Sequence, residues 1–189
     1  SPQGQEEARQ ANNHSTAHDA QVIAFAMYAG NMKVAREVIN AIPRKRLFTQ
    51  IEPDGKQPHE LRRTLAFGYS QFNLSHFIDI FMMARKIGIS IDNATSEDGR
   101  SFYKAMDFLV PYVGKDVKAW PYQQISEWKY KQQEFCKDLY RTFLLNPERK
   151  DYLKLYKTHR IIDWKDRFNL LWMEADDVDN AYAFACGQL

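Results

Sequence analysis

Two adjacent amides and an imidazole stand together near the start of this 189-residue chain. Asn12 and Asn13 precede His14 in the stretch EEARQANNHSTAHDAQVIAFAM, and the apolar run that ends the stretch is typical of a helix. Amide and imidazole groups donate and accept hydrogen bonds without requiring a charge. Binding groups are commonly placed on loops over a rigid scaffold. The segment is therefore a candidate binding loop at the start of a helix.

The same segment could instead be a metal site. His14 and His18 are spaced i, i+4, and Asp19 follows directly. On a helix, two such histidines could share a face and bind zinc. The spacing lacks the glutamate of the HExxH pattern, and a zinc site needs three or four ligands with supporting partners. We therefore expect no metal here.

A second candidate segment is DGKQPHELRRTLAFGYSQFNL, which reads as a turn, a proline at the first helical position and a helix. It contains Arg62, Arg63 and Tyr69. Because an ideal helix turns 100° per residue, Arg62 shares a face with Tyr69. Arg63 does so only if the helix deforms near Gly68. The alternative interpretation is a solvated arginine pair and a tyrosine that packs in the core.

The net charge of +2 does not by itself indicate a nucleic-acid-binding protein. The charges are nevertheless unevenly placed. One short region is rich in basic residues and has fewer acidic ones: Arg44, Lys45, Arg46, Lys56, Arg62 and Arg63, against Glu52, Asp54 and Glu60. The end of the chain is acidic, with Glu174, Asp176, Asp177 and Asp179. The basic cluster is either an uneven solvated surface or a patch that faces an anionic ligand.

No apolar run approaches the length of a membrane span. The polar start Ser1-Pro2-Gln3-Gly4 has no initiator methionine and no signal-peptide pattern, so we expect a processed or truncated chain. Cys136 and Cys186 form no CxxC pair, and a thiolate zinc site is not expected. The two thiols could form a disulfide in an oxidising compartment or remain free and buried.

Nearly every segment has the apolar spacing of a helix. Asp19 is a suitable N-cap for the first strong helical pattern, and Gly30-Asn31 separates it from the second. The expected helices span 20–30, 32–42, 59–88, 101–113, 125–145, 148–159 and 168–188, with a short strand over 47–51 and a turn at 53–55. Short connections between such helices predict an all-α array of antiparallel hairpins.

Four segments, in this order, resemble the alginate lyases and their uronan-degrading relatives, which are all-helical polysaccharide lyases. NNHSTAHDAQ resembles the family's Asn-Asn-His-Gly-Thr-aromatic-aromatic-Asp segment. DGKQPHELRRTLAFGYSQFNL resembles its Asp-Gly-x-Gln-Pro-x-Glu-Leu-x-Arg-Thr-x-x-x-x-Tyr-Ser-x-x-Asn-Leu segment, and EDGRSFYKAMDFLVPY and KAWPYQQI resemble later ones. The resemblance covers roughly residues 5–130. Ser15 replaces the family's glycine and Ala17-His18 its aromatic pair, which are differences in the lining of the substrate cleft.

The resemblance implies β-elimination on a uronic-acid polymer, such as alginate or a glucuronan, with no metal or organic cofactor. A base removes the proton beside the sugar carboxylate, and donors that face this carboxylate stabilise the enolate-like transition state. Asn13 and His14 match the neutralising and base positions. Arg63 matches the family's arginine, with Arg62 as the alternative. Tyr69 matches the residue that protonates the leaving oxygen and that can also act as base.

The resemblance also implies an (α/α) toroid, incomplete in this chain. We expect residues 1–189 to be the C-terminal portion of one such domain, accompanied by its missing N-terminal part or self-associated. Trp120 and Tyr122 are candidate sugar-binding rings or core residues. We expect a bacterial, periplasmic or secreted enzyme that acts on an acidic polysaccharide, without nucleic acid or membrane insertion. The alternative, motivated by Ala17 and His18, is a non-catalytic helical carbohydrate-binding or scaffold protein.

Overall fold

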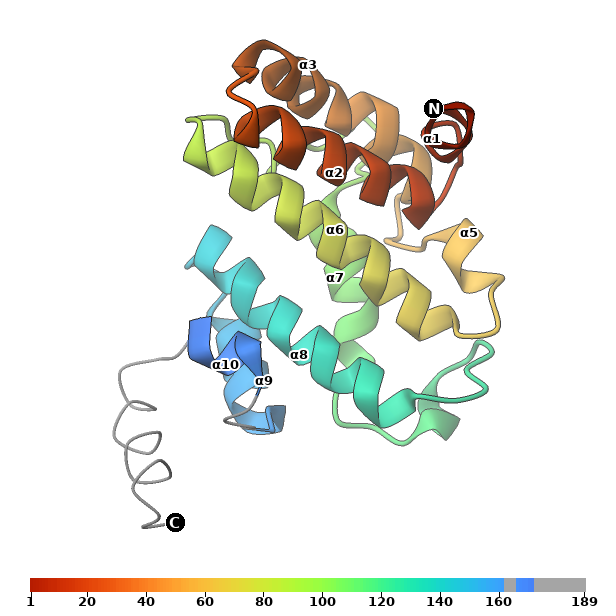
Figure 1. The fold of residues 1–189 in the computed structure, drawn as a ribbon. Coiled ribbons are helices and arrows are strands. Elements are labelled where there is room, and N and C mark those ends of the chain that lie inside the picture. Colours follow the sequence, from red (N-terminus) through yellow and green to blue (C-terminus); the bar gives the residue numbers. More distant parts are fainter. Residues whose placement is uncertain (162–165, 172–189) are drawn as a thin grey trace.

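Apolar side chains at helical spacing form helices and no strand within residues 1–161 and 166–171, which the computed structural model describes (Figure 1). The α-helices are α1 (Pro2–Glu7), α2 (Asn13–Tyr28), α3 (Met32–Ile42), α4 (Phe48–Gln50), α5 (Pro58–Leu61), α6 (Ala66–Lys86), α7 (Phe102–Leu109), α8 (Trp128–Leu145), α9 (Lys150–His159) and α10 (Arg167–Leu171). A π-helical turn, Pro43–Leu47, joins α3 to α4, and 3-10 turns follow at Val110–Tyr112 and Val117–Ala119. The all-α prediction is confirmed.

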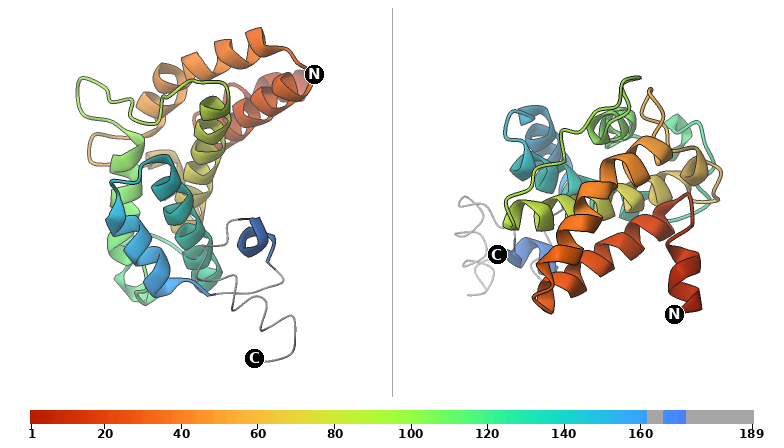
Figure 2. Two further views of the ribbon diagram at one scale, coloured as in Figure 1. Left: turned by 90° about the vertical axis from the view of Figure 1, so that its left-hand side faces the viewer. Right: turned by 90° about the horizontal axis from the view of Figure 1, so that it is seen from above.

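Three long helices, α2, α6 and α8, lie side by side in one layer with α6 in the middle (Figures 1 and 2). A second helix accompanies each of them: α3 packs on α2, α7 on α6 and α9 on α8. The predicted hairpins are these three pairs. Helices α2 and α6 are neighbours in this layer, and their first turns lie close together. Both candidate segments lie at these first turns.

The core forms where α6 meets its neighbours. Phe67, Phe77 and Phe81 of α6 are almost completely buried. The ring of Phe81 meets Phe102 of α7 edge-on at 5.0 Å, and the ring of Phe67 meets Phe135 of α8 at 5.7 Å. Burial of each such ring contributes about 1.5–3 kcal/mol. Helix α6 is therefore the rigid element against which the other helices are placed.

Two local predictions near the start of the chain are wrong. Helix α2 begins at Asn13, with Asn12 as its N-cap, and not after Asp19. Asp19 instead lies buried within α2, where its Oδ2 accepts a hydrogen bond from Nε of Arg46 at 2.7 Å. The strand predicted over 47–51 is helical as far as Gln50, because buried side chains four residues apart also fit one face of a helix.

The end of the chain lies largely outside the described residues. Of the helix predicted over 168–188, the structure describes the part within α10, so Cys186 and the acidic residues of 174–179 are not described. Cys136 is buried in α8, and burial raises the pKa of its thiol to about 12. A buried thiol of this kind is a poor nucleophile at neutral pH. In the part of the chain that is described, none of the helices has the length and apolar character needed to cross a membrane.

The turn between α4 and α5 requires glycine at position 55. The φ angle of Gly55 is +87°, a conformation that residues with a Cβ rarely adopt. A Cβ atom there would lie 2.1 Å from the carbonyl oxygen of Lys104 in α7. The backbone of the turn thus touches α7 directly, and this contact fixes where α5 begins.

We predict that Gly55→Ala destabilises the fold more than Gly30→Ala does. Gly30 also has a positive φ, +72°, but a Cβ there would meet nothing within 4 Å. The control should therefore lose only the backbone cost of about 1–2 kcal/mol. The steric conflict with α7 should add about 1–3 kcal/mol at position 55. Urea unfolding of both variants measures the difference, and equal losses would contradict the close packing of this turn.

Candidate functional site

A buried carboxylate holds the first turn of α2. The backbone N–H of Asn13 donates to Oε1 of Glu60 at 2.6 Å, and its side-chain Nδ2 donates to Oε2 at 2.7 Å. Asn13 is 4% exposed and Glu60 is 1% exposed. Burial raises the pKa of Glu60, while the hydrogen bonds from Asn13 oppose the rise. Since a carboxylate at a helix N-terminus is favoured by the helix dipole, Glu60 both caps α2 and fixes the direction of the Asn13 amide.

A network of neutral side chains supports this turn. Oε1 of Gln50 accepts hydrogen bonds from Oγ1 of Thr16 at 3.1 Å and from Nδ2 of Asn73 at 2.8 Å. Nε2 of Gln50 donates to Oγ of Ser15 at 3.2 Å. Nδ2 of Asn73 also donates to Oε1 of Gln57 at 2.8 Å. The network ties α2, α4 and α6 together, and Ser15, which replaces the family's glycine, takes part in it.

His14 lies at the exposed side of the same turn, with 45% of its side chain accessible. Its Nδ1 is 2.7 Å from Oε2 of Glu7 at the end of α1. When Nδ1 carries the proton, this N–H donates a hydrogen bond to Oε2 of Glu7. Nε2 then keeps the lone pair that a general base needs. Arg46 holds α1 in place, because its guanidinium donates to the carbonyl of Ala8 at 2.8 Å as well as to Asp19.

The single helix predicted over 59–88 is wrong, since residues 62–65 separate α5 from α6. The side-chain oxygen of Gln124 accepts hydrogen bonds from the N–H groups of Phe67 at 3.0 Å and Gly68 at 3.3 Å. A distant side chain therefore caps the start of α6. Residues 62–65 contain no glycine or proline that would have indicated the break.

The break turns Arg63 toward Tyr69. The guanidinium carbon of Arg63 lies 3.9 Å from the centroid of the Tyr69 ring, which is a cation–π contact. Arg62 is exposed at the C-cap of α5 and does not line the cleft described below. The ideal-helix argument for Arg62 therefore fails, because residues 62–65 are not helical. Of the two arginines, the geometry favours Arg63.

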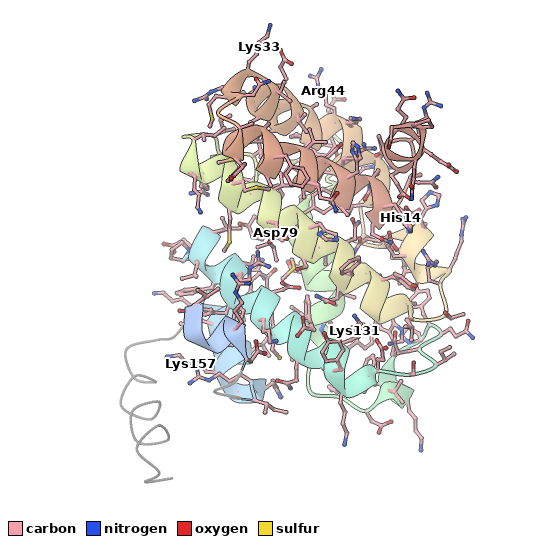
Figure 3. All side chains as sticks on the ribbon, viewed as in Figure 1. His14, Lys33, Arg44, Asp79, Lys131 and Lys157 are labelled. Atoms are coloured by element: carbon pink, nitrogen blue, oxygen red, sulfur yellow. The ribbon has the colours of Figure 1, made fainter. Side chains whose placement is uncertain are left out.

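The four residues assigned catalytic roles by the resemblance, Asn13, His14, Arg63 and Tyr69, border one cleft of about 710 Å³. Figure 3 shows His14 at the start of α2. The full lining is Ser1, Gln3, Gly4, Glu7, Asn13, His14, Ala17, His18, Gln21, Arg63, Tyr69 and Phe72. The positions that depart from the family pattern, Ala17 and His18, are among them.

The two rings predicted to bind sugar do not lie at this cleft. Trp120 is 5% exposed and packs edge-on against Tyr112 at 4.8 Å and Phe67 at 5.4 Å. Tyr122 is half-buried, with its ring 5.2 Å from that of Trp120. The structure thus places both rings in an aromatic cluster behind α6, which is the core alternative considered for them.

The basic residues of 44–63 do not form one patch. Arg46 is buried against Asp19, and Nζ of Lys56 lies 2.6 Å from Oδ2 of Asp54. Arg63 lines the cleft, whereas Arg62 is exposed and is not part of its lining. Of the lysine and arginine side chains in 44–63, the one that lines the cleft is therefore Arg63.

Three residues of the site carried no clear sequence signal for their role. Glu7 and Glu60 act through His14 and Asn13, and Phe72 lines the cleft one helical turn after Tyr69. Glu60 belongs to the ELRRT part of the second segment, but nothing in the local sequence indicates that its partner is Asn13. The spacing of Phe72 from Tyr69, three residues on one helix, was the only available pointer to its position.

The cleft combines groups of complementary chemistry. An amide, an imidazole and a guanidinium can hold a carboxylate, and an imidazole and a phenol can remove and supply protons. Among the described residues, no group of three or more His, Cys, Asp or Glu side chains is arranged to hold a metal ion. His14 is engaged by Glu7, and Nδ1 of His18 lies 3.3 Å from Asp19.

Comparison with known proteins shows similarity to one protein family and to a solved structure. A family model described as alginate lyase matches residues 1–120. The crystal structure of an alginate lyase from Bacteroides ovatus is similar, with 47% sequence identity and a TM-score of 0.86. The match covers 90% of this chain and 45% of that chain, so the chain spans less than half the length of that protein. No curated protein matches the chain significantly.

We predict that Glu60→Gln lowers both stability and activity. The amide of the variant presents one oxygen and one N–H₂ group to two donors of Asn13, so one buried donor loses its acceptor. This loss should cost about 1–3 kcal/mol of unfolding free energy. Glu37→Gln, on the exposed side of α3, is the matched control and should change little. Unfolding in urea reads out the difference, and a Glu60→Gln variant as stable as the control would contradict the capping role.

Proposed function

Because the chain belongs to the alginate lyase family, we propose that it carries the elimination chemistry of a polysaccharide lyase. The family has an (α/α) toroid fold, and the three hairpins described above have the arrangement of an arc of such a toroid. The observation that carries the proposal is the meeting of Asn13, His14, Arg63 and Tyr69 at one cleft. The substrate class is a uronic-acid polymer, such as alginate or a glucuronan.

The first requirement of the reaction is to stabilise negative charge on the sugar carboxylate. Removal of the adjacent carbon-bound proton pushes electrons toward a group that is already anionic. In the proposed complex, the amide of Asn13 and the guanidinium of Arg63 donate to this carboxylate, and the enolate-like transition state is favoured. Glu60 holds the amide in position, so little reorganisation is needed as charge develops.

The second requirement is proton transfer at two sites. Nε2 of His14 takes the proton from the carbon beside the carboxylate, and the released electron pair forms the carbon–carbon double bond. The bond from the neighbouring carbon to the glycosidic oxygen then breaks, and Tyr69 donates its phenolic proton to that oxygen. Where the carbon-bound proton and the leaving oxygen lie on the same face of the ring, Tyr69 starts as the phenolate, takes that proton and then gives it to the leaving oxygen. Arg63, stacked on the ring, stabilises the phenolate in both cases.

A binding protein without turnover is the second candidate. Ala17 and His18 line the cleft where the resembling family carries two aromatic residues, and loss of those rings would alter the grip on sugar. Incubation with polymannuronate, polyguluronate and glucuronan, followed by ultraviolet absorbance of the unsaturated product, distinguishes the two functions. Absorbance that rises on any of these polymers supports the lyase, and binding with no rise on all of them supports the alternative.

The proposed setting is outside the cytoplasm. A uronan polymer is too large to enter a cell intact, so an enzyme that acts on it belongs in the periplasm or in the medium. We propose the same location for this protein, with an acidic polysaccharide as its partner.

We predict that Tyr69→Phe lowers turnover by about 100-fold or more, the scale of a lost general acid. The variant keeps the ring under Arg63, so folding should be retained, as circular dichroism would show. Tyr28→Phe, at a tyrosine that is 94% exposed, is the control and should leave turnover unchanged. Near-normal activity of Tyr69→Phe on every polymer that the parent cleaves would reject the role.

The adjacent arginines provide a second test. Arg63→Met removes a donor to the developing charge and should lower kcat/KM by about 100- to 1,000-fold. Arg62→Met removes the same charge one residue earlier, at an exposed position, and should change kcat/KM by no more than about twofold. Steady-state kinetics on one cleaved polymer compare the two, and a larger loss for Arg62→Met would restore the helical-face assignment.

A further inference from the structure

Tyr69 and Phe72 line two hollows at once. One is the cleft that holds Asn13, His14 and Arg63. The second is smaller, about 220 Å³, and is completed by Leu65 and Gly68 of the α6 start and by two residues of the α8 start, Glu127 and Lys131. The two hollows are therefore neighbours that share one wall, and the phenol of Tyr69 belongs to that wall.

The position of the phenol has a consequence for substrate binding, given the function proposed above. A glycosidic oxygen joins two sugar rings, so the group that protonates it must lie at the boundary between the sites of the two rings. Asn13, His14 and Arg63 occupy the cleft and face the ring that loses its proton. The ring that departs with the oxygen then needs a place beyond Tyr69, and the smaller hollow is adjacent to Tyr69.

The smaller hollow contains one cation that can pair with an anionic sugar. Nζ of Lys131, on the second turn of α8 (Figure 3), forms no ion pair in the part of the chain that the structure describes. Glu127, the residue before α8, has φ of 60° and places an acceptor at the rim.

The shape of the hollow also fits a sugar ring. Phe72 is 42% exposed although it is a large apolar residue, and its ring is the apolar surface available for a pyranose face. Gly68 allows Lys131 to lie close to α6, because a Cβ at position 68 would be 3.1 Å from Cγ of Lys131. The absence of a side chain at Gly68 thus keeps the lysine stem beside the hollow.

We propose that this hollow is the subsite for the departing uronate unit. Lys131 pairs with the carboxylate of that unit, Glu127 accepts hydrogen bonds from its hydroxyl groups, and Phe72 packs against its ring. Lys131 is a binding residue in this proposal and takes no part in proton transfer. The assignment rests on the proposed lyase function, because it uses Tyr69 as the proton donor.

The test separates binding from turnover. Oligomers prepared from the polymer that the protein cleaves fastest are titrated into Tyr69→Phe and into Tyr69→Phe with Lys131→Met, using calorimetry. We expect the second protein to bind about tenfold more weakly, and the difference to shrink as salt screens the pair. In the otherwise unchanged chain, Lys131→Met should raise KM by a similar factor with kcat largely retained, and Lys131→Arg should restore most of the affinity.

Lys129→Met is the matched control, because it removes the same charge from the same end of α8 at a position outside both hollows. Circular dichroism verifies that each variant is folded. Equal affinity and equal KM for the Lys129 and Lys131 variants, with turnover intact, would overturn the subsite while leaving the lyase function in place. A parent chain that neither binds nor cleaves any uronan would overturn both proposals.

Discussion

The contact between Asn13 and Glu60 is the constraint on which the site depends. One carboxylate accepts both the backbone and the side-chain N–H of Asn13, and it comes from α5, the third α-helix after α2. The contact starts α2 at a fixed point and places His14 beside the cleft. It also keeps α5 close to α2, so that the chain enters residues 62–65 in the position from which Arg63 reaches Tyr69. The negative charge that does this is buried beneath the amide rather than exposed to an anionic ligand.

Around this contact, neutral amide side chains join the helices, and a cation faces the cleft. Gln50, Gln57 and Asn73 join α2, α4 and α6 without an ionisable group. Arg63 is the cation that faces the cleft. This division suits an anionic substrate, because a network of amides neither repels it nor changes its own charge with pH.

Much of the architecture was predictable because it follows from local rules. Apolar spacing predicted the helices of the three hairpins, and the turn at 53–55 followed from its proline and glycine. The site residues came from a different source. The order of the two segments identified Asn13, His14, Arg63 and Tyr69 by resemblance, and the structure brings these four together. Composition and spacing alone did not distinguish a site from a solvated surface.

The failures have a common physical cause, which is that the deciding partner lies far along the chain. Asp19 has the character of an N-cap, yet Arg46 draws it into the core. Arg62 shares an ideal helical face with Tyr69, yet the helix is interrupted between them. Trp120 could bind a sugar or pack in the core, and its distant neighbours determine which of the two it does.

The role of Gln124 at the start of α6 has a further consequence. The first turn of the helix that carries Tyr69 is held by a loop, and loops open more readily than packed helices. Local unfolding of that loop would release the two N–H groups and let the turn fray while the core of α6 remained intact. The position of the Tyr69 phenol therefore depends on this loop as well as on the packing of Phe67 in the core.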